Sequence, residues 1–107
     1  MTILGEKYKV IITNPIGSRL DTNNKVVFKV NYGIVEGVLD ASGEPQYAYV
    51  LDADEPIESF EGHLVAIVHR VNDVENKWII SNYHLSKEEI YEKISFIEGF
   101  FNIEIIL

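Results

Sequence analysis

The chain has 107 residues, with 9 Lys and Arg against 17 Asp and Glu, a formal charge of −8 at pH 7. This length predicts one domain, residues 1–107, large enough to bury a core of its own. The absence of cysteine excludes disulfides, thiolate zinc sites and cysteine nucleophiles. The acidic balance argues against nucleic-acid binding and against attraction to anionic membranes, because both need a basic surface.

The sequence has no pattern typical of a targeting signal or of a membrane span. The first residues lack the apolar stretch and cleavage site of a signal peptide. The most apolar stretch, residues 96–107, is interrupted by Glu98, Asn102 and Glu104 and is too short to cross a bilayer. We therefore expect a cytoplasmic protein without a membrane partner.

Short runs rich in Val, Ile and Tyr alternate with turn-forming residues over most of the chain. The predicted strands span residues 8–12, 26–30, 34–39, 46–51, 63–69 and 77–80. The run 63–69 is almost continuously apolar, which favours a central strand. Strands of this length and spacing are typical of a small barrel or a sandwich.

The pattern changes to that of a helix after residue 85. Ser86 and Glu89 are spaced as a capping box, in which each side chain bonds the backbone N–H of the other residue. An apolar stripe at helical spacing then follows at Ile90, Ile94, Ile97 and Phe101. Residues 103–105 alternate and suggest a last short strand. The predicted class is mainly β (α+β), a small β-barrel with one C-terminal helix packed on it.

Carboxylates are dense in the middle of the chain. Seven lie between residues 40 and 61, and Asp73 and Glu75 follow. Acidic turns in an acidic protein are explained by solubility alone. A second interpretation is a Mg²⁺ site, because Mg²⁺ binds carboxylate oxygens together with substrate phosphates.

Two further side chains are candidates for contact with a phosphate. Lys77 lies two residues after Glu75, so both can face the same way on a strand. An ordinary surface ion pair explains the same spacing. Tyr32 stands between Asn31 and Gly33 in a predicted turn, where its hydroxyl can face a ligand.

Several short motifs, in order and with their spacing, resemble the small bacterial soluble inorganic pyrophosphatases. The resemblance rests on Asn14-Pro15-Ile16-Gly17-Ser18, Val30-Asn31-Tyr32-Gly33, Ala48-Tyr49-Val50-Leu51, Asp54-Glu55-Pro56, Phe60-Glu61-Gly62, Ala66-Ile67-Val68-His69-Arg70, Glu75-Asn76-Lys77, Phe100-Phe101 and Ile105-Ile106. It covers essentially the whole chain. It implies a compact, five-stranded, OB-like barrel with a flanking helix.

The resemblance also implies a reaction and a set of site residues. In that family Mg²⁺ ions and cationic side chains hold diphosphate, and a metal-activated water attacks phosphorus. Carried over by position, Tyr32, Lys77 and Arg19 would bind the ligand. Glu44 and Glu75 would be catalytic, and Glu44, Asp73 and Glu75 would bind the metal.

The family's three-carboxylate signature is not kept. Where the family has Asp-Gly-Asp-x-x-Asp, this chain has Ser42-Gly43-Glu44-Pro45-Gln46-Tyr47, in which Glu44 is the one remaining carboxylate. Because Mg²⁺ needs anionic oxygens, we expect weakened or lost diphosphate hydrolysis, with a diphosphate or another phosphorylated small molecule as ligand.

Two alternatives stay open from the sequence. One is an active Mg²⁺-dependent inorganic pyrophosphatase with a rebuilt metal site, in which Asp40 joins Glu44, Asp73 and Glu75. The other is a non-catalytic interaction module, a homo-oligomer that pairs through its apolar tail, residues 100–107.

Overall fold

A computed structural model describes residues 4–20, 23–71, 73 and 75–107 of the chain. The main sheet contains, in spatial order, β1 (Lys7–Asn14), β4 (Asn31–Leu39), β5 (Pro45–Val50), β7 (Asn76–Ser81), β6 (Ser59–Arg70) and β8 (Ile103–Ile106). Two shorter strands, β2 (Arg19–Leu20) and β3 (Asn23–Val27), form a separate pair. The α-helix seen in the described residues, α1 (Lys87–Glu98), precedes β8.

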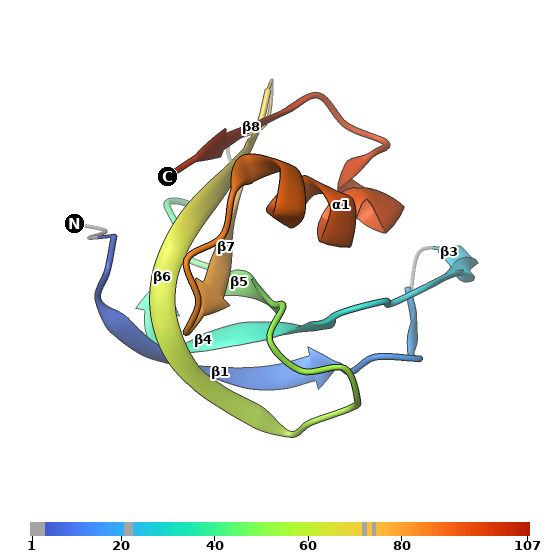
Figure 1. Cartoon of the computed structure of the whole chain (residues 1–107), viewed down its shortest axis with the longest axis horizontal. Coiled ribbons are helices and arrows are strands. Elements are labelled where there is room, and N and C mark those ends of the chain that lie inside the picture. Colours follow the sequence, from blue (N-terminus) through green and yellow to red (C-terminus); the bar gives the residue numbers. More distant parts are fainter. Residues whose placement is uncertain (1–3, 21–22, 72, 74) are drawn as a thin grey trace.

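The sheet closes on itself through β1. This strand pairs with β4 along one edge and with β6 along the other, so β1, β4, β5, β7 and β6 form a closed barrel. The β5–β7 pair is parallel, whereas the other pairs are antiparallel. The long, curved β6 also carries β8 on its far edge (Figure 1). The predicted small barrel with one C-terminal helix is confirmed.

Two apolar clusters form the core. The first packs Ile90 and Ile94 of α1 against the sheet and includes Tyr49 and Ile79. The second draws on all five barrel strands and is built around Trp78. Because neighbouring residues of β5 and β7 belong to different clusters, these two strands are buried on both faces. Double burial explains why both strands read as nearly continuous apolar runs.

The capping box predicted for α1 is present. The Ser86 hydroxyl accepts a hydrogen bond from the Glu89 N–H at 3.1 Å, and the Glu89 carboxylate accepts one from the Ser86 N–H at 3.0 Å. Within the described residues, no helix is both long and apolar enough to cross a membrane.

The predicted helical stripe is wrong at its last position. Ile90, Ile94 and Ile97 are buried as expected, but α1 ends at Glu98 and Phe101 lies in the turn beyond it, 45% exposed. The cause is a tighter winding after the helix, where the Phe101 N–H bonds the Glu98 carbonyl at 3.0 Å. This winding leaves Phe101 off the stripe.

The predicted turn at Asn31-Tyr32-Gly33 is also wrong, because these residues begin β4. Asn31 is fully buried, and its side chain joins two loops: it accepts from the Ile16 N–H and donates to the Glu55 carbonyl, both at 3.0 Å. The hydrogen-bonding capacity that suggests a turn is used in long-range contacts. The strand expected at residues 26–30 lies earlier, as β3, and ends at Val27.

Candidate functional site

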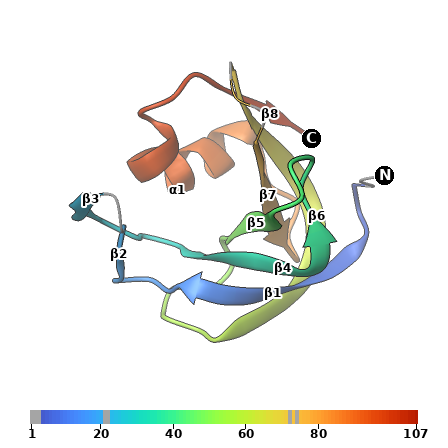
Figure 2. The same ribbon diagram turned by 180° about the vertical axis from the view of Figure 1, so that it is seen from behind.

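A cavity of about 240 Å³ opens between the barrel, the β2–β3 pair and the end of α1. We call it the Tyr32–Lys77 cleft. Its lining residues are Leu20, Phe28, Tyr32, Tyr49, Arg70, Lys77, Ile97 and Phe101. In Figures 1 and 2, α1 lies across one side of the barrel, and β2 and β3 project from the barrel on the side of the C-terminal end of α1. Aromatic rings and two cations therefore face the same small space.

Tyr32 is the central ring of a stack in this cleft. Its ring centroid lies 5.4 Å from that of Phe28 and 5.2 Å from that of Tyr47, and Tyr49 tilts against it at 4.8 Å. Burial is the main cause that raises the pKa of Tyr32 well above its usual value. The phenol is therefore protonated at neutral pH and can donate a hydrogen bond.

Lys77 is a buried cation with one carboxylate neighbour in contact. Its side chain is 9% exposed, and its Nζ lies 3.4 Å from an Oε2 of Glu75, whose own side chain is 44% exposed. The ammonium also lies 5.0 Å from the Tyr47 ring and 5.9 Å from the Tyr32 ring. A cation this buried, with one long contact to a solvent-accessible carboxylate, can accept an anion as an additional partner.

Arg70, the second cation, is paired with a buried carboxylate. Its Nε and Nη2 donate to the two carboxylate oxygens of Glu98 at 2.9 and 2.7 Å. The Tyr49 hydroxyl donates to Glu98 at 2.6 Å, and the guanidinium stacks 4.0 Å from the centroid of Phe101. The hydrogen bonds to Glu98 raise the pKa of Arg70, with burial opposing them. Burial, aided by Glu98, raises the pKa of Tyr49.

The site residues predicted from the sequence did not include Arg70 or Glu98. The sequence did contain one signal for it: Glu98 lies four residues after Ile94, at a helical position that faces the core. A charged residue at such a position needs a buried partner.

Asp73 and Glu75 are neighbours, but the expected catalytic and metal-binding carboxylates do not all come together. Glu44 is exposed in the turn between β4 and β5, Asp73 accepts from the Glu75 N–H at 3.0 Å, and Glu75 contacts Lys77. Across residues 4–20, 23–71, 73 and 75–107, no three His, Asp or Glu side chains form a group that could hold a metal ion. The three carboxylates that the resemblance assigns to Mg²⁺ therefore do not form one group.

Asp40, the carboxylate of the rebuilt-site alternative, is occupied within its own turn. Its Oδ1 accepts from the Ser42 N–H at 2.9 Å, the Ser42 hydroxyl at 2.6 Å and the Glu44 N–H at 3.0 Å. The bond from the Ser42 hydroxyl is the main cause that lowers the pKa of Asp40.

The segment 42–47 meets the ring stack through its last residue. Tyr47 stacks on Tyr32 with the two rings 8° from parallel, and Lys77 lies above the Tyr47 ring. This segment therefore contributes an aromatic ring to the stack. Arg19 lies on β2, is exposed, and is next to Leu20 of the cleft lining.

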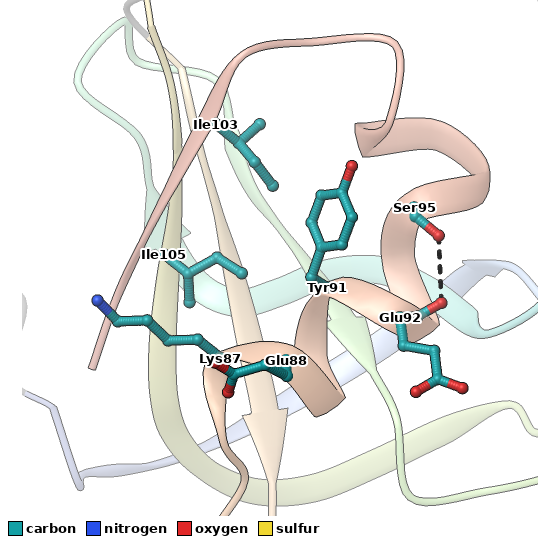
Figure 3. A pocket seen from close by; sticks show the side chains of 7 residues that line it. All are labelled: Lys87, Glu88, Tyr91, Glu92, Ser95, Ile103 and Ile105. Atoms are coloured by element: carbon teal, nitrogen blue, oxygen red, sulfur yellow. Dashed lines mark hydrogen bonds between the residues drawn. The ribbon is translucent and has the colours of Figure 1, made fainter.

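A second, larger cavity of about 620 Å³ lies on the other side of α1, between the helix and β8. Figure 3 shows Tyr91 facing Ile103 and Ile105 across it. In the described sheet β8 is the edge strand, and Ile106 is 41% exposed. Self-association of copies through this tail stays a prediction.

Comparison by sequence does not assign the chain to a group of proteins: no protein-family model and no curated protein matches it. The assignment of fold therefore rests on solved structures.

Three solved structures are similar over nearly the whole chain. An inorganic pyrophosphatase from Ehrlichia chaffeensis has a TM-score of 0.69 and 12% identity, over 96% of this chain and 86% of that one. An inorganic pyrophosphatase from Helicobacter pylori has a TM-score of 0.62 and 18% identity, over 97% and 86%. An inorganic phosphatase from Anaplasma phagocytophilum has a TM-score of 0.60 and 16% identity, over 94% and 82%. At these identities the likeness establishes the fold, and this chain has the fold of the inorganic pyrophosphatases.

Proposed function

We propose that this protein binds a phosphate-bearing small molecule in the Tyr32–Lys77 cleft and does not hydrolyse diphosphate as a metal-dependent enzyme does. The observation that carries the proposal is the buried cation of Lys77, which lines a cavity of about 240 Å³ together with Tyr32. A charged donor in a small cavity suits the oxygens of a phosphate group.

The fold supports phosphate as the ligand chemistry. Two of the similar structures are named inorganic pyrophosphatases, and the cleft of this chain keeps the Lys77 and Tyr32 that the sequence resemblance assigns to ligand binding. Arg19, on the neighbouring β2, belongs to the same proposal as a third ligand contact.

The positions of the carboxylates argue against hydrolysis. Of the proposed catalytic residues, Glu44 lies on an exposed turn and Glu75 is the neighbour of Lys77. The rebuilt metal site is disfavoured because one Asp40 oxygen already accepts three hydrogen bonds within its turn. Without a group of carboxylates, the protein offers Mg²⁺ few anionic oxygens besides those of the ligand itself.

Ligand binding is tested by thermal unfolding of the wild type, Lys77→Met and Lys87→Met with inorganic phosphate and with diphosphate. Lys87 is an exposed lysine at the start of α1 and serves as the matched control. We expect at least one of these phosphates to raise the Tm of the wild type and of Lys87→Met, because a ligand of the native state stabilises it. Lys77→Met should show no increase. An equal increase in all three proteins would place the phosphate outside the cleft.

The absence of hydrolysis is tested separately, by phosphate release from diphosphate with and without Mg²⁺. We expect the background rate in both conditions. Turnover of about 10 per second, typical of enzymes, that requires Mg²⁺ and is lost in Glu75→Gln would instead support the active-enzyme alternative.

A further inference from the structure

The two cations of the Tyr32–Lys77 cleft differ in how firmly they are paired. Arg70 makes two short hydrogen bonds to Glu98, a carboxylate with no exposed surface, and Tyr49 donates a third bond to the same carboxylate. Lys77 has a single contact of 3.4 Å to Glu75, which is 44% exposed. Bidentate Arg–carboxylate pairs are among the strong polar contacts, whereas a long contact to an exposed carboxylate is weak.

This difference decides which cation can meet a ligand. Glu75 can rotate into water and release Lys77 at little cost, because its side chain is already partly solvated. Glu98 has no such path, since it is fully buried and would have to leave three hydrogen bonds. Glu98 therefore stays paired with Arg70, and of the two cations that line the cleft, Lys77 is the one left for an incoming anion.

The walls of the cleft define the rest of the ligand. Phe28, Tyr32, Tyr49 and Phe101 present rings to it, and Leu20 and Ile97 complete an apolar lining. A volume of about 240 Å³ is below the usual range for sites that hold drug-sized ligands. An apolar body no larger than a single ring, with one acidic group directed at Lys77, matches both the lining and the size.

We propose that the cleft selects a ligand with one phosphate on a small, flat apolar body, and that buried Glu98 sets this selectivity by withholding Arg70 from polyanions. This inference rests on the proposed phosphate binding and names its ligand class. Glu98 acts as a specificity-determining residue through Arg70, without touching the ligand.

The test measures dissociation constants for phenyl phosphate, inorganic phosphate and diphosphate by calorimetry, without divalent metal. Phenyl phosphate carries one phosphate on one ring, and diphosphate carries more charge and no apolar body. We expect the wild-type protein to bind phenyl phosphate at least about tenfold more tightly than it binds diphosphate, because the ring makes contacts that diphosphate cannot make.

The matched variants are Glu98→Gln and Glu92→Gln, which change the net charge equally. Glu92 is exposed on α1 and lines the other cavity. In Glu98→Gln the negative charge beside Arg70 is removed, so the guanidinium can attract a second anionic group. This variant should therefore bind diphosphate about tenfold to a hundredfold more tightly than wild type does. Phenyl phosphate should gain less, and Glu92→Gln should keep the wild-type ratio of the two constants.

The outcomes separate this inference from the proposed function. If none of the three phosphates binds wild type in a manner lost in Lys77→Met, the proposed function fails and the selectivity fails with it. If phenyl phosphate binds through Lys77 but diphosphate binds as tightly to wild type, or Glu98→Gln leaves the ratio unchanged, the selectivity alone is wrong. If Glu98→Gln does not fold, the ratio of the wild-type dissociation constants for phenyl phosphate and diphosphate tests the selectivity.

Discussion

Glu98 shows how much of this site depends on a single residue. It is fully buried at the end of α1, where the negative pole of the helix dipole disfavours an anion. Arg70 donates two hydrogen bonds to the Glu98 carboxylate and Tyr49 donates one, and these bonds compensate for the unfavourable position. A buried pair of this kind gives little net stability, but losing one partner is costly because the other charge stays buried.

At this scale we predict the effect of removing one hydroxyl. Tyr49→Phe should lower the free energy of unfolding by about 1.5–3 kcal/mol, the usual contribution of a hydrogen bond to a charged group. Tyr47→Phe is the control, because Tyr47 contributes its ring to the stack, and it should change stability by less than about 0.5 kcal/mol. Urea unfolding of both variants measures the difference, and equal losses would show that the Tyr49–Glu98 bond does not stabilise the fold.

At the scale of elements, the turn between β4 and β5 is organised by one carboxylate. Asp40 accepts bonds from Ser42 and Glu44, and Gly43 takes the positive φ of 88° that closes the turn. The same hydrogen bonds stabilise the ionised form of Asp40 and lower its pKa. The stability that this turn contributes therefore depends on pH.

The lowered pKa of Asp40 predicts the sign of a pH effect. Its stabilising contribution is complete above the unfolded-state pKa and is lost as the pH falls through the lower folded-state value. The Tm advantage of wild type over Asp40→Asn should therefore shrink between about pH 6 and about pH 2. Ser42→Ala, which removes the bond from the hydroxyl, should reduce this pH dependence. An advantage that grows on acidification would contradict the assignment.

At the scale of the whole molecule, closure of the barrel depends on close contact between β1 and β4. Gly33 of β4 lies opposite Ile12, and a Cβ at this position would collide with the backbone of Ile11. At Gly62 of β6, paired with Tyr8, the nearest atom to an added Cβ would be Cε2 of the Phe60 ring at 2.6 Å. A backbone neighbour cannot give way, whereas a ring can rotate.

This contrast predicts that alanine substitutions beside β1, one in β4 and one in β6, lower the free energy of unfolding by different amounts. Gly33→Ala should lower the free energy of unfolding by more than about 3 kcal/mol, whereas Gly62→Ala should cost about 1–2 kcal/mol because Phe60 can shift. Urea unfolding compares them directly. A Gly33→Ala variant as stable as Gly62→Ala would mean that the β1–β4 seam can open without affecting the rest of the barrel.

What the sequence by itself determined about this protein is local. Most of the strand runs, the C-terminal helix and its start at Ser86 follow from side-chain periodicity and from hydrogen bonds between residues three apart. The presence of a single carboxylate, Glu44, within residues 42–47 is likewise readable without coordinates. These features depend on residues close together in the chain, so their patterns survive in a single sequence.

The tertiary structure alone decided what the site contains. Arg70 and Glu98 are 28 residues apart, and Tyr49 and Glu98 are 49 apart; they meet because β8 and α1 pack beside β6 and β5. Tyr32 is a half-buried strand residue, and the neighbouring Asn31 is buried because it reaches two distant loops. Such contacts depend on the register of the strands and on barrel closure, and no local pattern carries that information.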